Sequence, residues 1–219
     1  KGVSPFKNVL VNDLLLDSEG KKMSKSKGNI VEPFTTMKEY GADTVRFYLP
    51  YVSPVWTPLK FDVNGLKEVH SKFFNPLKNT YSFFTIYANI DNIDPRKYNI
   101  EYKDLEEIDK WLFSKLNKLI KNVTDSYEEY DLNKVVKNIT DFVSEDLSNW
   151  YIRRNRKRFW GNELNNSKKC VYYTTYKTLL DLSKLIAPIT PFISEEIYQN
   201  LTNEESVHLS DFPKYNKES

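Results

Sequence analysis

The sequence is poor in the residues that build metal sites and disulfides. Its 219 residues include one cysteine, Cys170, and two histidines, His70 and His208. A single cysteine excludes an internal disulfide, and these three side chains cannot supply the usual four-ligand zinc site. No apolar run approaches the roughly 20 residues that span a bilayer, and no charged-then-apolar leader opens the chain. We therefore expect a protein of a reducing, cytoplasmic compartment, with no metal site and no membrane contact.

The chain also lacks a large net charge. Its 32 basic and 30 acidic side chains leave a net charge of +2, so binding to nucleic acid must come from a local patch. Only six glycines and an aromatic content of 15% argue against disorder. A chain of this length forms one good core, or one domain and part of another. We expect it to be a monomer.

The most informative motif that is present is a short lysine- and serine-rich loop, Lys22-Met23-Ser24-Lys25-Ser26. Its ammonium groups supply charge for phosphate oxygens and its hydroxyls supply donors. Gly28, just beyond it, lets backbone amides approach a ligand closely. A solvated polar turn would also contain such residues. The pattern favours a loop that grips a triphosphate.

The first part of the chain predicts short elements. Residues 6–11 and 14–17 read as strands, and the loop follows them. One helix is predicted from Pro33 to a break at Gly41, and a second over residues 42–49, stopped by Pro50. Residues 53–58 form a proline-containing linker.

From Asp62 onward the apolar period becomes that of long helices. Asp62 is a predicted cap, and Pro76 predicts a kink in the helix that follows. Further helices are predicted over residues 105–127, from a cap at Asp131 to Gly161, over 167–187, and from Thr190-Pro191. The predicted fold is mainly α, an antiparallel helix bundle with a short β-containing N-terminal segment. The predicted divisions are residues 1–58, 59–205 and an extended tail over 206–219 that leads out of the bundle.

Arginine is scarce, yet four of the six arginines fall between Trp150 and Trp160. Arginine suits bidentate contact with phosphate and stacking on bases. At 100° per residue, Arg153, Arg154 and Lys157 continue the apolar stripe on which Val143, Leu147 and Trp150 lie. Either the helix end projects beyond its neighbours, or its arginines meet acidic partners inside the bundle. A solvated cationic helix end is the simpler alternative. The residues predicted to bind RNA are Trp150, Arg153, Arg154, Arg156, Lys157, Arg158 and Trp160.

Together these strings resemble the class I aminoacyl-tRNA synthetases over nearly the whole chain. Residues 22–26 match their KMSKS signature, and Tyr40-Gly41-Ala42-Asp43 with Arg46 resembles the linking helices after it. Asp43 and Arg46 themselves could pair along a helix. The body is similar to the helical anticodon-binding domain of the isoleucine, valine, leucine and methionine enzymes. It is most similar to the isoleucine enzymes, through residues 53–61, 79–84, 87–91 and 147–160.

The resemblance implies activation of isoleucine by ATP with Mg²⁺, followed by transfer to tRNA-Ile. Lys25 would act as the catalytic residue by neutralising charge on the departing pyrophosphate. Lys22, Met23, Ser24 and Ser26 would complete the ATP-binding loop. The family's His-x-Gly-His loop cannot be built from the two histidines present.

We therefore expect a piece of a larger enzyme, with a mobile loop and no aminoacylation of its own. Two alternatives stay open. The chain could be the corresponding piece of a valyl-, leucyl- or methionyl-tRNA synthetase, or a free-standing RNA-binding module without catalysis.

Overall fold

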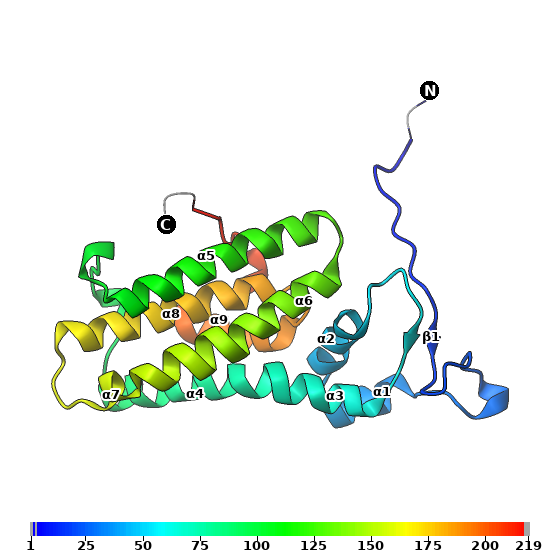
Figure 1. The fold of residues 1–219 in the computed structure, drawn as a ribbon, viewed down its shortest axis with the longest axis horizontal. Coiled ribbons are helices and arrows are strands. Elements are labelled where there is room, and N and C mark those ends of the chain that lie inside the picture. Colours follow the sequence, from blue (N-terminus) through cyan, green and yellow to red (C-terminus); the bar gives the residue numbers. More distant parts are fainter. Residues whose placement is uncertain (1, 3, 217–219) are drawn as a thin grey trace.

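The helices dictated by the apolar periodicity form an elongated body with a bundle at one end and the loop segment at the other (Figure 1). The computed structural model describes residue 2 and residues 4–216. The fold is mainly α, as predicted. None of the helices in this described part is long and apolar enough to cross a membrane. The helices are α1 Pro33–Tyr40, α2 Ala42–Val52, α3 Val63–Val69, α4 Asn75–Ile90, α5 Glu107–Glu128, α6 Leu132–Asp141, α7 Arg153–Trp160, α8 Asn166–Ile186 and α9 Pro191–Thr202.

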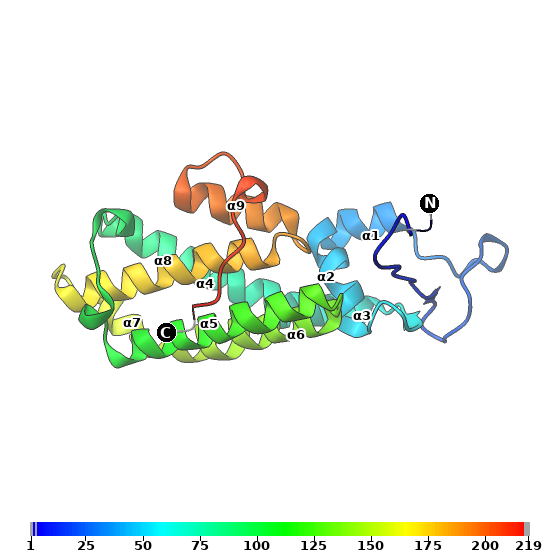
Figure 2. The same ribbon diagram turned by 90° about the horizontal axis from the view of Figure 1, so that it is seen from above.

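The core lies where α4, α5, α6 with its continuation into α7, and α8 face one another (Figure 2). Leu112, Val123, Val136, Ile139 and Leu179 are fully buried there. Each apolar residue removed from water in this way contributes about 1.5–3 kcal/mol. α9 packs on the outside of α8, which makes α8 the most buried helix of the bundle.

The N-terminal segment contains less strand than its sequence suggests. The strands are β1, Leu15–Leu16, and β2, Leu59–Lys60, which pair in parallel with Leu15 opposite Leu59. The strand predicted over residues 6–11 is wrong, because the structure places that segment in extended chain outside any sheet. Val9 and Val11 are 67% and 71% exposed. Their β-propensity has no neighbouring strand to act on.

Pro50 and Pro76, which were predicted to stop and to kink a helix, both lie within helices. α2 continues through Pro50 to Val52, so the predicted stop at that proline is wrong. The Asn133 side chain from α6 donates to the carbonyls of Pro50 (2.7 Å) and Tyr51 (3.1 Å), which satisfies acceptors that a helix end leaves open. Before Pro76, residues His70–Phe74 form a π-helical segment. This departure from α-helical geometry ends just before Pro76, and the kink at Pro76 stays a prediction.

The linking helices hold the start of α9 through two charged side chains. Asp43 accepts hydrogen bonds from the backbone N–H groups of Phe192 (3.4 Å) and Ile193 (2.8 Å). Arg46 donates to the carbonyls of Pro188 (3.1 Å) and Ile189 (2.9 Å). The two side chains therefore grip the α8–α9 connection instead of pairing with each other. Thr190, at the cap position, makes no capping bond through its side chain.

Replacing Asp43 with alanine should lower the free energy of unfolding by about 1–2 kcal/mol, because it removes the cap of α9. Burial raises the pKa of the Asp43 carboxyl, so ionising it costs stability as the pH rises through that pKa. Asp43→Asn keeps an oxygen acceptor without that charge and should be at least as stable as the parent at pH 7. Urea titration of both variants checks this. Equal losses in the two variants would contradict the capping role.

Beyond α9 the chain turns back across the bundle. Val207–Leu209 form a 3₁₀ turn, and the Phe212 ring packs edge-on against Tyr127 of α5 at 6.0 Å. The Asn117 amide then exchanges two hydrogen bonds with the backbone of Asn216. The sequence predicted an extended tail leading out of the bundle. The described part up to Asn216 instead lies along α5.

Candidate functional site

The lysine-rich loop projects from the strand end of the molecule. Leu16 of β1 forms an antiparallel bridge with Lys22, and Lys25–Lys27 make one 3₁₀ turn. Gly28 ends the turn with φ +67°, a conformation that glycine adopts without strain. The side chains of Lys22 and Lys25 are exposed. The loop thus presents its ammonium groups to solvent on a closed turn.

Hydroxyl groups and one apolar anchor complete the loop. Ser24 Oγ and Ser26 Oγ lie 3.2 Å apart, close enough to contact one anionic group together. Met23 is partly buried against the core, which ties the middle of the loop to the protein. Lysines for charge, hydroxyls for donation and an open glycine are the chemistry that a polyphosphate requires. In the described part of the chain no cluster of three or more metal-binding side chains is present.

The second predicted site lies on α7 and the helical turns before it. Arg153, Arg154, Arg156 and Lys157 are exposed. The guanidinium of Arg154 stacks on the Trp150 ring at 3.6 Å from its centroid. Such stacking holds an aromatic ring and a cation side by side at the surface. Trp160 is also 51% exposed.

Arg158 differs from the other arginines of this cluster. Its Nη1 and Nη2 each lie 2.8 Å from an oxygen of Asp109, a carboxylate that is fully buried. Its Nε and Nη2 also donate to Ser167. The structure therefore places Arg158 inside the bundle, held by an acidic partner. Of the arrangements that the sequence allowed, Arg158 takes the internal one with an acidic partner, whereas Arg153, Arg154 and Arg156 are exposed to solvent on a helix that packs against α8.

A change of helix geometry explains this division. Residues Phe142–Ile152 form a π-helical segment between α6 and α7. The segment moves the apolar stripe by one position, so Tyr151 is fully buried and Trp150 is 45% exposed. The stripe predicted through Trp150 toward Arg153 and Arg154 is wrong, because it assumed a regular α-helical period.

Trp111 of α5 lies on the same surface as Trp150 and was not predicted as a site residue. Its ring lies 6.2 Å from that of Trp150, and Lys115 Nζ lies 5.5 Å from its centroid. Trp111 lies about 40 positions before Trp150, and nothing in the sequence links the two.

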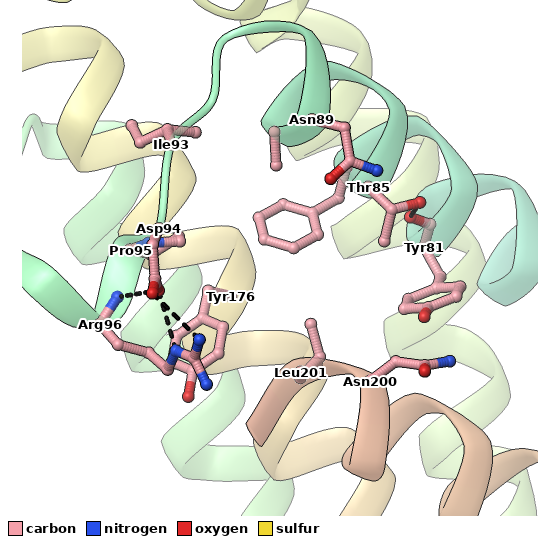
Figure 3. Close-up of a pocket in the computed structure, with 12 residues that line it drawn as sticks. Tyr81, Thr85, Asn89, Ile93, Asp94, Pro95, Arg96, Tyr176, Asn200 and Leu201 are labelled. Carbon is pink, nitrogen blue, oxygen red and sulfur yellow. Dashed lines mark hydrogen bonds and ion pairs between the residues drawn. The ribbon is translucent and has the colours of Figure 1, made fainter. Parts of the chain in front are cut away.

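A hollow of about 400 Å³ opens between α4, α8 and α9 (Figure 3). Tyr81, Thr85 and Asn89 of α4 face Asn200 and Leu201 of α9 across it. The Arg96 guanidinium at its edge is bound by both oxygens of Asp94 and donates to the carbonyl of Thr202. This cation is therefore neutralised and adds nothing to the basic surface.

The loop and α7 lie at opposite ends of the elongated body in both views (Figures 1 and 2). The description "Anticodon-binding domain of tRNA ligase" matches residues 109–219, which include α7, and "tRNA synthetases class I (I, L, M and V)" matches residues 1–62, which include the loop. The chain belongs to the class I tRNA synthetases.

Related proteins place this synthetase chain within the class. It is 47% identical over 219 residues to an isoleucine–tRNA ligase of Bacteroides thetaiotaomicron, covering 97% of this chain and 19% of the relative. The isoleucine–tRNA ligase of Thermus thermophilus is 42% identical, with coverage of 97% and 21%. The chain thus spans about a fifth of the length of these relatives.

Solved synthetase structures share the fold. The LeuRS of Agrobacterium radiobacter K84, in a ternary complex with tRNA and LeuAMS, has a TM-score of 0.71 and 24% identity, covering 94% of this chain and 24% of that one. The methionyl-tRNA synthetase of Mycobacterium tuberculosis, in complex with methionyl-adenylate, has a TM-score of 0.68 and 21% identity, covering 84% of this chain and 36% of that one. At these identities the likeness concerns the fold.

Proposed function

We propose that this chain is the part of an isoleucine–tRNA ligase that joins the KMSKS loop to the tRNA-binding helical domain. The observation that carries the proposal is the placement of a phosphate-binding loop and an arginine-rich surface at opposite ends of one elongated body. A synthetase must bind ATP at one place and a distant part of a long tRNA at another, on the same protein. A binding module without catalysis has no need of the loop, and the 42–47% identity to isoleucine–tRNA ligases favours isoleucine over the other amino acids of the class.

The exposed lysines and paired hydroxyls of the loop support a role for it in binding ATP. Lys25, on the exposed turn, neutralises charge that develops on the pyrophosphate leaving group as the isoleucine carboxylate attacks ATP. Lys22 and the hydroxyls of Ser24 and Ser26 hold the phosphates, and Met23 anchors the loop. Mg²⁺ enters with the ATP phosphates. Catalysis of this kind is electrostatic stabilisation of a transition state.

The helical end takes the role of tRNA binding. Arg153, Arg154, Arg156 and Lys157 contact phosphates, and Trp150 and Trp160 offer faces on which bases can stack. Arg158 supports this surface from within through Asp109. We further propose a monomeric enzyme of the cytoplasm, divided at residue 58 as the sequence predicts, with the segment after residue 205 packed on the helical domain.

A titration of the 219-residue chain against several purified tRNAs tests the proposal. We expect isoleucine tRNA to bind at least about tenfold more tightly than tRNAs for unrelated amino acids, a difference of about 1.4 kcal/mol. All measurements are made at one salt concentration, because the phosphate contribution depends strongly on salt. Equal affinity for every tRNA would favour a general RNA-binding module instead.

A further inference from the structure

Two side chains close the KMSKS loop at its base. The amide of Asn29 donates from Nδ2 to Asp17 Oδ2 at 2.7 Å and to the carbonyl of Lys22 at 3.3 Å. Its oxygen, Oδ1, accepts the backbone N–H of Ser24 at 2.9 Å. One side chain therefore contacts the beginning of the loop and two positions within the signature.

Asp17 shapes the turn that leads into the signature. Its Oδ1 accepts the backbone N–H groups of Glu19 (3.0 Å) and Lys21 (2.8 Å), while its backbone N–H donates to the carbonyl of Lys21 (2.9 Å). The other carboxylate oxygen takes the Asn29 amide. The bond from Asn29, followed by that from the Lys21 backbone, lowers the pKa of the Asp17 carboxyl. The group is therefore ionised at neutral pH and accepts strong, charge-assisted bonds.

The hydrogen bonds that close the base of the loop do not use the ammonium groups of its lysines. Among the described residues, Lys22, Lys25 and Lys27 have no carboxylate within ion-pair distance, whereas Lys21 pairs with Glu19 at 2.5 Å. The loop is thus ordered by hydrogen bonds between its backbone, the Asp17 carboxylate and the Asn29 amide, and its lysine side chains take no part in them. A site whose groups are held in place before the ligand arrives loses less entropy on binding.

We propose that Asp17 and Asn29 form a clasp that positions the KMSKS loop, holding Lys22 and Lys25 on a preformed turn before ATP binds. The functional part of this inference rests on the proposed isoleucine–tRNA ligase activity. The structural part does not. Asp17 and Asn29 bond to each other and to the backbone of residues 19–24, and they would act on ATP through that loop, so both are positioning residues.

Because Asn29 donates and Asp17 accepts, the two residues can be exchanged between their positions. Such an exchange distinguishes loss of this hydrogen bond from a general loss of stability. In Asp17→Asn the Asn29 amide meets another amide, and in Asn29→Asp two carboxylates face each other. Either single change breaks the clasp. In the double variant Asp17→Asn/Asn29→Asp, position 17 supplies the N–H donor and position 29 the carboxylate. The acceptor for the Ser24 N–H is retained, and only the bond to the Lys22 carbonyl is lost.

Trypsin cleavage of the 219-residue chain reads out the clasp without any catalysis. The loop carries Lys22, Lys25 and Lys27, and cleavage requires that its base opens. We expect each single variant to be cut within the loop about five times faster than the parent, and the double variant to return to within about twofold of it. The matched control is Glu19→Gln, which removes a pair whose side chains are 66% and 69% exposed and should leave the rate unchanged. Equal rates for all variants, or a double variant as fast as the singles, would overturn the clasp.

The same variants in the complete synthetase test the positioning role. Isoleucine-dependent exchange of pyrophosphate into ATP should show a kcat about five to ten times lower in each single variant, recovered in the double variant, with an unchanged KM for isoleucine. Faster cleavage without a change in kcat would overturn the role in catalysis. A complete parent protein that shows no isoleucine-dependent exchange would instead refute the proposed function. The cleavage rates would still decide the clasp.

Discussion

Replacing Asp109 with alanine should lower the free energy of unfolding by about 3–5 kcal/mol. The carboxylate is fully buried and accepts four hydrogen bonds, two from Arg158 (2.8 Å each), one from the Tyr151 hydroxyl (2.5 Å) and one from the Glu106 N–H (3.1 Å). Without it, the Arg158 guanidinium, whose side chain is 12% exposed, loses its close buried partner. Leaving a charge unpaired inside a protein costs far more than the pair itself contributes. Urea titration of the 219-residue chain measures the loss.

Two further variants separate the buried charge from the loss of volume. Asp146→Ala removes an aspartate whose pair with Lys115 lies near the surface, with side chains 25% and 43% exposed, and should cost less than about 1 kcal/mol. The double variant Asp109→Leu/Arg158→Met removes both buried charges and should be clearly more stable than Asp109→Ala. A double variant as unstable as the single one would show that packing, rather than the unpaired charge, dominates.

The sequence predicts the helices of the bundle well because each carries its own apolar period. α5 and α8 begin and end within two residues of their predicted bounds, and α9 begins at the predicted Pro191. Asp131 caps α6 as expected, accepting the backbone N–H of Lys134. The KMSKS loop is equally visible, since its residues are contiguous. Local signals of this kind need no knowledge of the partners.

Contacts between distant segments are what the sequence does not reveal. In the sequence Asp109 is an ordinary acidic residue at a helix start, and the residues around it do not predict its ion pair with Arg158. The π-helical segment Phe142–Ile152 has no sequence signature comparable to a cap or a proline, yet it decides which of the basic residues face solvent. Asp43 and Arg46 lie one helical turn apart and suggested a pair. Their real partners lie more than 140 positions away.

The loop shows the same limit on a smaller scale. Its signature residues were predicted from their chemistry, and it was expected to be mobile. Asp17 and Asn29, which tie its base, lie outside the signature and were not singled out as site residues. A search for donors and acceptors on both sides of the signature could have suggested Asn29. Only the structure shows that its amide reaches back to Asp17.

Exchanging Arg153, Arg154, Arg156 and Lys157 together for alanine should weaken the binding of isoleucine tRNA about a hundredfold at 0.15 M salt. Each phosphate contact adds about 0.7–0.9 to the slope of log affinity against log salt, so four lost contacts should flatten that slope by about three. All four side chains are exposed, and the buried Asp109–Arg158 pair is untouched, so the fold should persist. Binding titrations at several salt concentrations measure both quantities.

The control for this variant is a chain with the same loss of charge elsewhere. Exchanging Lys38, Lys67, Lys118 and Lys137 for alanine also changes the net charge from +2 to −2, at exposed positions on α1, α3, α5 and α6. If tRNA is held at α7, this chain should lose only a few-fold in affinity and keep most of its salt slope. If both chains weaken alike, tRNA responds to overall charge, and the arginine-rich surface is not its docking site.

Arg158→Ala alone should mainly lower stability, because its guanidinium is bound to Asp109 and Ser167 inside the bundle. A loss of tRNA affinity in that variant without a loss of stability would return Arg158 to the binding surface.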